Sequence, residues 1–384
     1  MTRRDDPIVY LPGVRWSDVA GTDHRLVTAL SETAPVLWVD PPFSLATASP
    51  DAGSLLSGLS DVGPDIVRLQ TRTIPGPSRS ALRPVADAMI AASIRRAVSE
   101  LDLDVGAVVV ASSRAAFPAG VAGTRVLHVT DDWVAGARMM GSSSSTIART
   151  LEQNAMRADV VTAVTPYLAG LLEARFPSAA AVKVLPNGCE PPSGIRSTPS
   201  PVAGLVGQLN ERLDFDVLEA ILARGIRILV IGPRTERTPQ ATRRLDRFLG
   251  AEQVSWLGAL PHWELAAHLA TMGVGLTPYA ENEFNRSSFP LKILEYLAAG
   301  LAVVSTDLPA VTWLDTDLID VAADPADFAG RVESVLAEPL TGEPAEARRL
   351  QREAFARGHS WKSVAAQLRG ILADSVPASE VDSG

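Results

Sequence analysis

Lys292 and Glu295, two side chains of opposite charge, stand three positions apart in the segment 284–300. On a helix this spacing places both side chains on one face, about one turn apart. A lysine in the first turn opposes the helix dipole, but a phosphate bound at the same end is attracted by both the lysine and the free backbone N–H groups. The pair fits a diphosphate site, in which Lys292 contacts phosphate and Glu295 accepts hydrogen bonds from ribose hydroxyls, but by itself it is more typical of a routine ion pair on a surface helix.

The neighbouring residues predict a short helix over 290–299. Ser287 or Ser288 is typical of a helix N-cap, and Pro290 suits the first helical turn. Gly300 is typical of the residue that follows a helix. The alternative is a surface helix with a routine ion pair. We favour the diphosphate site, because the serines, the proline and the glycine coincide in a loop that follows a predicted strand.

The rest of the chain predicts the frame that positions this segment. Short apolar, β-branched runs alternate with helical patterns, which is typical of α/β folds with parallel sheets. Strands are expected at 8–10, 36–39, 66–69, 107–111, 126–129, 160–163 and 182–185, and then at 202–206, 226–231, 254–257, 274–277, 302–305 and 319–321. Doubly wound sheets bind ligands at the carboxyl ends of their strands, so the residues directly after strands are the candidates for a site.

A segment rich in proline and serine, 191–201, interrupts this alternation and reads as a linker. We therefore predict two doubly wound, Rossmann-like domains facing across a cleft. Their expected bounds are 1–195 and 196–355. A helix over 356–376 is expected to pack back on the first domain.

Composition narrows the class of protein. The 384 residues are 46% hydrophobic and 21% charged, and the net charge of −9 argues against a broad nucleic-acid surface. The chain has no apolar run of ~18 residues, the length that a membrane helix needs. A polar N-terminus predicts no signal peptide, and one cysteine, Cys189, fits a reducing compartment. We expect a cytoplasmic protein. The arginine-bearing stretch 78–96 could touch an anionic membrane, but a solvated helix face is favoured.

The residues at 288–300, Ser-Phe-Pro-Leu-Lys-Ile-Leu-Glu-Tyr-Leu-Ala-Ala-Gly, resemble the donor-binding segment of retaining glycosyltransferases of family 4, which have the GT-B fold. Supporting matches in order and spacing fall at 158–168, 185–190, 206–212, 256–265 and 273–279. The resemblance implies an acceptor domain followed by a donor domain. It also implies transfer of a sugar from a nucleoside-diphosphate sugar, with retention and with no metal or other cofactor. The implied acceptor is a glycan, a lipid-linked sugar or a small natural product.

The family's functional residues transfer to matching positions of this chain. Lys292 and Arg212 would hold the diphosphate and stabilise charge on the leaving group, and Trp256 would border the nucleobase. The implied donor-binding residues are Gly207, Arg212, Trp256, Ser287, Ser288, Pro290, Leu291, Lys292 and Glu295. The family pattern places a glutamate at position 287, where this chain has serine, so the identity of the sugar is not implied.

The first half of the chain offers acceptor-side candidates. The loop after strand 8–10 contains Gly13, Arg15 and Trp16, and His24 opens the next helix. His24 could act as a base or a hydrogen-bond donor, but a capping or structural role is favoured for a lone histidine.

Two carboxylates, Asp131 and Asp132, follow strand 126–129. Asp131 is the candidate for contact with the reacting centre and is counted with Arg212 and Lys292 as catalytic. Asp132 is an acceptor-side candidate or a helix N-cap.

Two alternative functions are also compatible with the sequence. One is a nucleotide-sugar epimerase on the same fold, which needs no acceptor. The other is a catalytically silent nucleotide-sugar-binding protein, which the serine at position 287 motivates. Asp214 and Asp216 mimic an Asp-x-Asp metal motif, but they read as the start of a helix.

Overall fold

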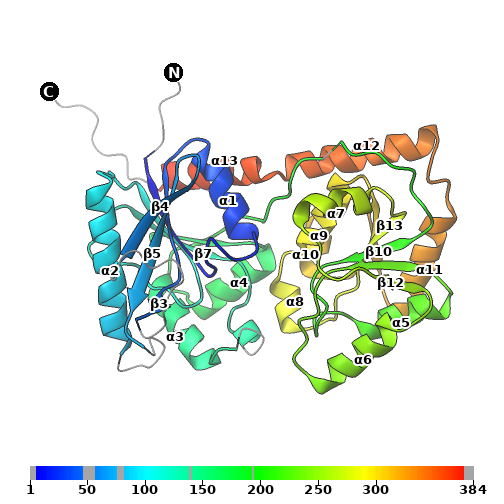
Figure 1. Ribbon diagram of the computed structural model, residues 1–384, viewed down its shortest axis with the longest axis horizontal. Helices are drawn as coiled ribbons and strands as arrows, with labels where there is room; N and C mark the ends of the chain where they lie inside the picture. The colour runs from blue at the N-terminus through cyan, green and yellow to red at the C-terminus, as the bar shows by residue number, and fades with distance from the viewer. Residues whose placement is uncertain (1–5, 46–56, 76–81, 138–140, 193, 376–384) are drawn as a thin grey trace. The chain divides into compact units, whose positions relative to one another are not determined.

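The computed structural model describes residues 6–45, 57–75, 82–137, 141–192 and 194–375 (Figure 1). The chain forms two compact units. The N-terminal unit consists of Met1–Pro186 together with Trp361–Gly384, and the C-terminal unit is Asn187–Ser360. The first unit ends at Pro186, before the boundary predicted at 195. The second unit ends at Ser360, after the boundary predicted at 355. Residues 78–81 of the stretch considered for membrane contact, residue 193 of the linker and residue 376 lie outside the described residues.

The sheet of the N-terminal unit has the strand order β3-β5-β2-β1-β6-β7-β8-β9, with β4 paired to β5. Among the described residues of this unit, all strand pairings are parallel except the one between β4 and β5. The strands are β1 (Ile8–Pro12), β2 (Val36–Val39), β3 (Phe43–Ser44), β4 (Ser57–Gly63), β5 (Ile66–Thr73), β6 (Ala107–Ala111), β7 (Thr124–Val129), β8 (Val160–Ala163) and β9 (Val182–Val184). The strand order reverses between β1 and β6, so the carboxyl ends of these two strands mark the expected ligand position.

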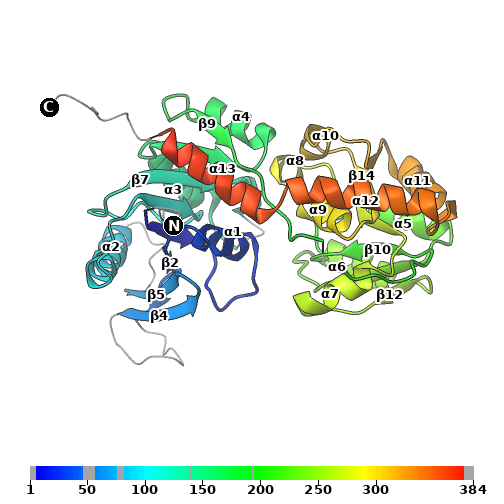
Figure 2. The ribbon, with the colours of Figure 1, turned by 90° about the horizontal axis from the view of Figure 1, so that it is seen from above.

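The helices of this unit are α1 (Thr22–Ser31), α2 (Arg83–Glu100), the 3₁₀ turn η1 (Ala135–Ala137), α3 (Ser144–Ala155), α4 (Pro166–Arg175) and α13 (Trp361–Ala373). α13 returns from the far end of the sequence and lies beside α1 (Figures 1 and 2). An ion pair of 2.8 Å joins Lys362 of α13 to Glu32 at the end of α1, and Gln367 donates a hydrogen bond to the carbonyl of Val184. The last helix is therefore part of the first unit.

The sheet of the C-terminal unit is fully parallel, with the order β12-β11-β10-β13-β14-β15. Its strands are β10 (Ala203–Val206), β11 (Ile228–Ile231), β12 (Val254–Trp256), β13 (Val274–Thr277), β14 (Ala302–Thr306) and β15 (Ile319–Ala322). β10, β13 and most of β14 are buried throughout, as expected for strands covered by helices on both faces. This is the doubly wound order of a dinucleotide-binding fold, and it reverses between β10 and β13.

The helices of this unit are α5 (Phe215–Ala223), α6 (Pro239–Leu249), α7 (His262–Leu269), α8 (Glu283–Ser287), α9 (Leu291–Ala298), α10 (Pro309–Trp313), α11 (Pro325–Ala337) and α12 (Glu343–Gly358). α9 and α12 pack together on one face of the sheet, and α5 and α11 pack together on the other (Figure 1). The helix expected over 356–376 is thus the end of α12 and then α13, which are separated at His359 and Ser360.

Every strand that the sequence predicts appears, with ends that differ by a few residues. β3 and β4 were not predicted, because β3 has only two residues and β4 is built largely from glycine, serine and aspartate, which are poor strand formers. Asp214 caps α5, since its Oδ1 atom accepts hydrogen bonds from the backbone of Asp216 and Val217. Asp216 pairs with Arg244. The Asp-x-Asp pair therefore starts a helix, as expected.

Candidate active site

Helix α9 is anchored over the point where the order of the second sheet reverses. Ile293, Leu294 and Leu297 are fully buried and form its apolar face. The hydroxyl of Tyr296 accepts a hydrogen bond from the backbone of Val206 at the end of β10 (2.9 Å) and lies 3.2 Å from the carbonyl oxygen of Gly204. The ring of Tyr296 covers β13 at Gly275, where a Cβ atom would lie 2.3 Å from the ring. This contact places the start of α9 at the carboxyl ends of β10 and β13.

The structure brings Lys292, Glu295 and Gly207 together at this position. Cε of Lys292 lies 3.7 Å from the point that a Cβ atom would occupy at Gly207, the first residue after β10. Nζ of Lys292 donates to Oε2 of Glu295 across 2.5 Å. Both side chains are largely buried, with 23% and 14% of their surfaces exposed. The lysine is therefore held against the strand end, where it is paired with the carboxylate predicted to bind ribose.

The two serines ahead of α9 do not cap it, which corrects the predicted N-cap. Both hydroxyls donate backward: Ser287 to the carbonyl of Glu283 (2.8 Å), and Ser288 to that of Phe284 (2.8 Å). They end the short helix α8, which occupies part of the loop that the sequence left irregular. The N-cap of α9 is Pro290, so α9 begins one residue later than predicted and has no side-chain cap.

The amide of Leu291 donates to the carbonyl of Phe289 (2.9 Å), and proline has no amide hydrogen. Of the two backbone positions expected to contact phosphate, neither offers a free N–H in this structure. Ser287 and Ser288 are buried. Phosphate contact by the start of α9 would therefore have to use amides deeper in the first turn or the side chain of Lys292.

Arg212 lies in the loop after β10 and is held by the loop that leads into α8. Its Nε atom donates to Oδ1 of Asn285 (2.9 Å), and its guanidinium lies 5.2 Å from the ring of Tyr279 and 5.0 Å from that of Phe284. The side-chain amide nitrogen of Asn285 donates hydrogen bonds to the backbone carbonyls of Arg212 and Ala280. Asn285 is 1% exposed. Sequence reasoning assigned it no role, although its position beside the predicted site could have marked it.

Trp256 lies at the same edge of the second sheet. Its indole N–H donates to the carbonyl of Gly232 after β11 (3.0 Å), and 42% of the residue surface is exposed. Gly232 packs so closely on Gly207 that a Cβ atom would lie 1.8 Å from the Gly207 carbonyl oxygen. The ends of β10, β11 and β12 thus form one continuous edge beside Lys292, with the exposed indole at its rim.

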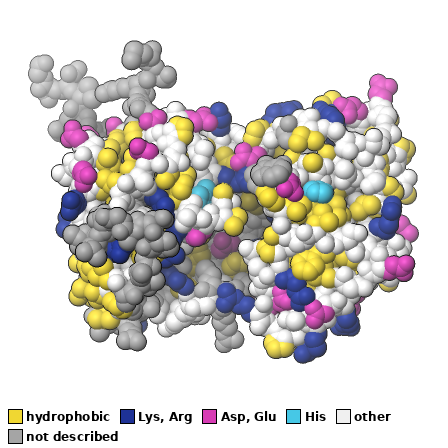
Figure 3. All heavy atoms as spheres, in the orientation of Figure 1, with side chains coloured by type: hydrophobic (Ala, Val, Ile, Leu, Met, Phe, Trp, Pro, Cys, Tyr) yellow, Lys and Arg dark blue, Asp and Glu magenta, His cyan; other side chains and the backbone are white. Residues whose placement is uncertain are grey.

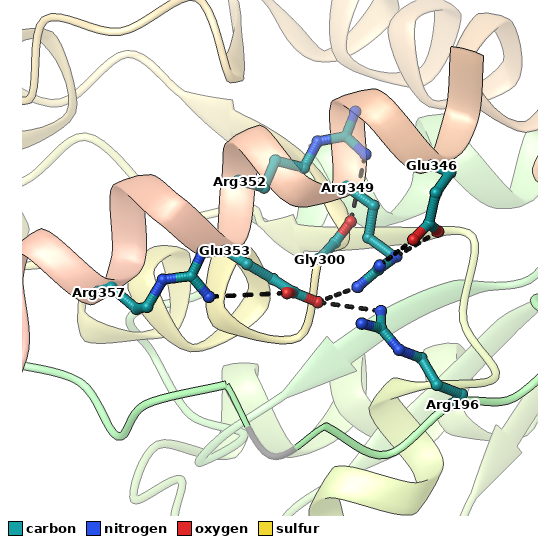
Figure 4. A network of polar contacts seen from close by, with 7 residues as sticks. All are labelled: Arg196, Gly300, Glu346, Arg349, Arg352, Glu353 and Arg357. Atoms are coloured by element: carbon teal, nitrogen blue, oxygen red, sulfur yellow. Dashed lines mark hydrogen bonds and ion pairs between the residues drawn. The ribbon is translucent and has the colours of Figure 1, made fainter. Parts of the chain in front are cut away.

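The far end of α9 is held by α12, as Figure 4 shows. Arg352 donates to the carbonyl of Gly300, which follows α9 (3.2 Å). Glu353, which is 7% exposed, pairs with Arg349 and with Arg196 of the segment that precedes β10. Cations near the C-terminus of a helix stabilise its dipole. α12 therefore helps to hold α9 in its position on the sheet.

In the N-terminal unit, the loop after β1 holds Gly13, Arg15 and Trp16, and it lies against the segment that follows β2. The backbone amide of Trp16 donates to Oδ1 of Asp40 (2.9 Å), and the two indoles of Trp16 and Trp38 meet edge to face at 5.0 Å. Gly13 is exposed, and a Cβ atom there would lie 3.8 Å from the carbonyl oxygen of Ala111 at the end of β6. The acceptor-side candidates therefore lie at the point where the first sheet reverses its order.

His24 is buried, and both ring nitrogens are engaged within the chain. Nδ1 lies 3.3 Å from the amide of Gly21 and accepts its hydrogen bond, so Nε2 is the protonated nitrogen that donates to the carbonyl of Trp16 (3.2 Å). The ring packs on Trp16 and Trp38. This geometry favours the capping role over the role of a general base.

Asp132 also has a local task, since its Oδ1 atom accepts the amides of Val134 and Ala135 at the start of η1 (3.0 Å each). Asp131 lies close enough to Asp23 of α1 for its charge to contribute to the pKa of Asp23, which is raised to about 6, chiefly by burial. The hydroxyl of Tyr10 donates to Asp23 across 2.7 Å and partly opposes that rise. Sequence reasoning missed Asp23, because only the fold brings it to Asp131.

Known proteins resemble the chain in both sequence and fold. Residues 200–338 match the family model described as Glycosyl transferases group 1. TuaH of Bacillus subtilis (strain 168), whose name describes a candidate glycosyltransferase of teichuronic acid biosynthesis, is 30% identical over 172 residues. That alignment covers 44% of this chain and 42% of TuaH, so the chain matches less than half the length of this relative.

The solved structures that resemble the chain cover nearly all of it. Sucrose-phosphate synthase from Thermosynechococcus elongatus has a TM-score of 0.72 at 15% identity, over 98% of this chain and 100% of that one. A UDP-forming α,α-trehalose-phosphate synthase from Burkholderia xenovorans, in complex with glucose-6-phosphate, has a TM-score of 0.70 at 14% identity, over 96% and 100%. Anabaena HepE, in complex with UDP and glucose, has a TM-score of 0.66 at 14% identity, over 95% and 99%.

These likenesses confirm the predicted fold. The chain has the GT-B fold, and residues 200–338 of its second unit match the group 1 glycosyl transferase family model. None of the helices in the described part of the chain has the length and apolarity that a membrane span requires. Acidic and basic side chains are interspersed on the face that Figure 3 shows.

Proposed function

We propose that this protein transfers a glycosyl group from a nucleoside-diphosphate sugar to a hydroxyl-bearing acceptor, with retention of configuration and without a metal. One observation carries the proposal. Lys292 lies at the start of α9 against Gly207, with Glu295 one turn further on, at the reversal point between β10 and β13. Such reversal points are where doubly wound sheets bind nucleotides.

The donor would bind through opposite charges. Lys292 and Arg212 are the cations at this edge, and Arg212 is already oriented by Asn285 and two aromatic rings. A diphosphate at Lys292 would compete with Glu295 for the ammonium group, because both ligands are anionic. The freed carboxylate can then accept hydrogen bonds from ribose hydroxyls, one turn deeper on the same helix face. The exposed indole of Trp256 offers a surface for the base.

Catalysis would consist mainly of charge stabilisation at the leaving group. The bond between the anomeric carbon and the β-phosphate oxygen breaks, and its electron pair goes to that oxygen. The acceptor hydroxyl oxygen bonds to the anomeric carbon on the same face, and its proton passes to the departing phosphate. Lys292 and Arg212 would stabilise the negative charge that develops on the nucleoside diphosphate.

A binding experiment tests the donor site. Thermal shift with UDP, GDP, ADP, dTDP and their glucose conjugates would identify the best nucleotide, and UDP is the first choice, because two neighbours were solved with UDP or a UDP-sugar. Calorimetry on Lys292→Ala and Glu295→Ala then gives affinities, with Lys362→Ala as the control, since Lys362 is exposed on α13. If neither site substitution weakens the best nucleotide, the assigned site is wrong.

A turnover experiment tests the reaction. Incubating the best sugar nucleotide with an acceptor panel, with and without EDTA, should give product that retains the anomeric configuration, in equal yield. Conversion of the donor to another sugar nucleotide without acceptor would favour the epimerase. Tight binding with no conversion would favour a silent binding protein.

A further inference from the structure

A cationic side chain at the carboxyl edge of the first sheet has no anionic partner in the part of the chain that the structure describes. Arg15 lies in the loop after β1, and its guanidinium carbon lies 4.1 Å from the centroid of the Phe43 ring. Stacking of this kind fixes the plane of the guanidinium and leaves its edge free to donate hydrogen bonds. The Nε atom of Arg15 is buried and has no hydrogen-bond partner among the described residues. Buried polar atoms are normally paired, so the unpaired Nε requires an explanation.

The nearby acids do not supply the missing partner. Asp40 is 1% exposed and already binds Arg68 (2.7 Å), the amide of Trp16 and the indole N–H of Trp38. Asp18 accepts the backbone amide of Arg15, not its guanidinium. In the same unit Arg68, Arg83 and Arg125 each pair with a carboxylate, whereas Arg72 and Arg95 form no ion pair with the described residues. Arg15 differs from the unpaired arginines in that its Nε atom is buried.

A second arginine lies on the same side of the sheet. Arg72 of β5 stands in register with Phe43 of β3, and side chains in register on neighbouring strands point to the same face. Arg72 is partly exposed, and its side chain forms no ion pair with the described residues. Phe43 is thus flanked by two arginines, one stacked on its ring and one beside it on the sheet.

Two acidic side chains lie further along the same edge of the sheet. Asp23 and Asp131 lie near each other beside β1 and β7, with Tyr10 bonded to Asp23. Two carboxylates repel an anion and accept hydrogen bonds from hydroxyl groups. A ligand of this edge that carried both hydroxyls and one anionic group would therefore be oriented, with its anion at Arg15 and hydroxyls toward the carboxylates.

We propose that Arg15 binds a carboxylate or phosphate group of the acceptor, so that this protein glycosylates anionic sugars. The inference rests on the proposed function, because it assigns the first unit to the acceptor. The guanidinium of Arg15 presents a planar set of N–H donors, which matches the oxygens of either anion. Arg72 adds positive charge beside Phe43.

The test compares three probes that differ mainly at one position of a hexose: glucose, glucuronate and glucose-6-phosphate. Calorimetry on the full chain measures each affinity in the presence of UDP. The wild-type protein should bind at least one anionic probe about tenfold or more tightly than glucose. The comparison of glucuronate with glucose-6-phosphate tells which anion is preferred. Equal affinities, or no binding of any probe, would overturn the proposal.

Variants assign the effect to Arg15. Arg15→Gln should remove the preference for the anionic probes and leave UDP affinity unchanged. Arg15→Lys should lower the preference, because lysine keeps the charge but not the planar donors. This variant replaces Arg15→Gln in the test if the glutamine variant does not fold. Arg96→Gln, on the exposed surface of α2, is the matched control and should keep the preference. If Arg15→Gln lowers the unfolding temperature but keeps the preference, Arg15 only packs on Phe43 and the proposal is wrong.

Failure of this inference can be told apart from failure of the proposed function. A wild-type protein that binds UDP through Lys292 but does not distinguish the three probes retains its donor site and loses only the anionic acceptor. A wild-type protein that does not bind any nucleotide contradicts the proposed function itself.

Discussion

The ammonium of Lys292 donates a hydrogen bond to the carboxylate of Glu295 across 2.5 Å, in the first turns of α9. The next residue of the same helix, Tyr296, accepts a hydrogen bond from the backbone of Val206 at the end of β10. The pair is therefore held at a fixed place on the sheet. The two charges already neutralise each other, so a bound phosphate has to replace Glu295 as the partner of the Lys292 ammonium group. Substitution of either member should therefore distinguish the contacts to the phosphates from the contacts to the ribose.

Inorganic pyrophosphate and UDP should respond differently to substitution of this pair. Lys292→Ala should weaken both by about tenfold or more, because a charge-assisted contact to phosphate is lost. Glu295→Ala should weaken UDP, which loses its ribose contact, but should leave pyrophosphate unchanged or bound more tightly, because the lysine is no longer shared. Calorimetry measures both. Weaker binding of pyrophosphate to Glu295→Ala would contradict the exchange of partners.

Arg212 and Asn285 should act as one unit. Arg212→Gln and Asn285→Ala should each lower nucleotide affinity, because Asn285 orients the guanidinium. The double variant should be no weaker than Arg212→Gln alone, since residues in one hydrogen-bond network are not additive. The Kd values of the four proteins form the cycle. Losses that add would show that Asn285 acts independently of Arg212.

The position of α9 should depend on Tyr296. Tyr296→Phe leaves the buried amide of Val206 without its acceptor, which costs about 1–3 kcal/mol of the free energy of unfolding. Gly275→Ala should cost a similar or larger amount, because the new methyl group would overlap the ring of Tyr296. Urea unfolding gives both values. Nucleotide affinity should fall in parallel, and stability loss with normal affinity would show that α9 tolerates the shift.

Two titratable groups, the partly buried Asp23 and the buried His128, should make opposite contributions to stability between pH 4 and pH 6.5. The pKa of Asp23 is raised from 3.8 to about 6, so the folded state holds a proton that the unfolded state has lost, and stability falls as the pH rises through this range. Burial lowers the pKa of His128 from 6.5 to about 4, so its contribution is present above pH 6.5 and is lost as the pH falls toward 4. Each amounts to about 3 kcal/mol.

Asp23→Asn should therefore reveal the effect of His128 alone. We expect the variant to be more stable than the wild type at pH 7 and similar to it at pH 4, as measured by urea unfolding across the range. Tyr10 can still donate to the amide oxygen of asparagine, so the hydrogen bond is kept. A variant that loses stability equally at pH 4 and pH 7 would contradict the raised pKa of Asp23.

The sequence alone determined the alternation of buried strands and helices, because period and β-branched composition are local properties. It also placed α9 to within a residue at each end, since a proline and a glycine mark where a helix can begin and end. The pairing of Lys292 with Glu295 follows from helical spacing for the same reason.

The tertiary structure decided which groups those residues meet. Ser287 and Ser288 have the composition of caps, yet they bond backward to α8, because the loop folds as a helix of its own. Asp23 and Asp131 are far apart in the chain and come together only when β1 and β7 lie in one sheet. Arg15 has a defined orientation only because Phe43 is brought beneath it. Such contacts depend on the packing of distant elements, and no local pattern of residue types records them.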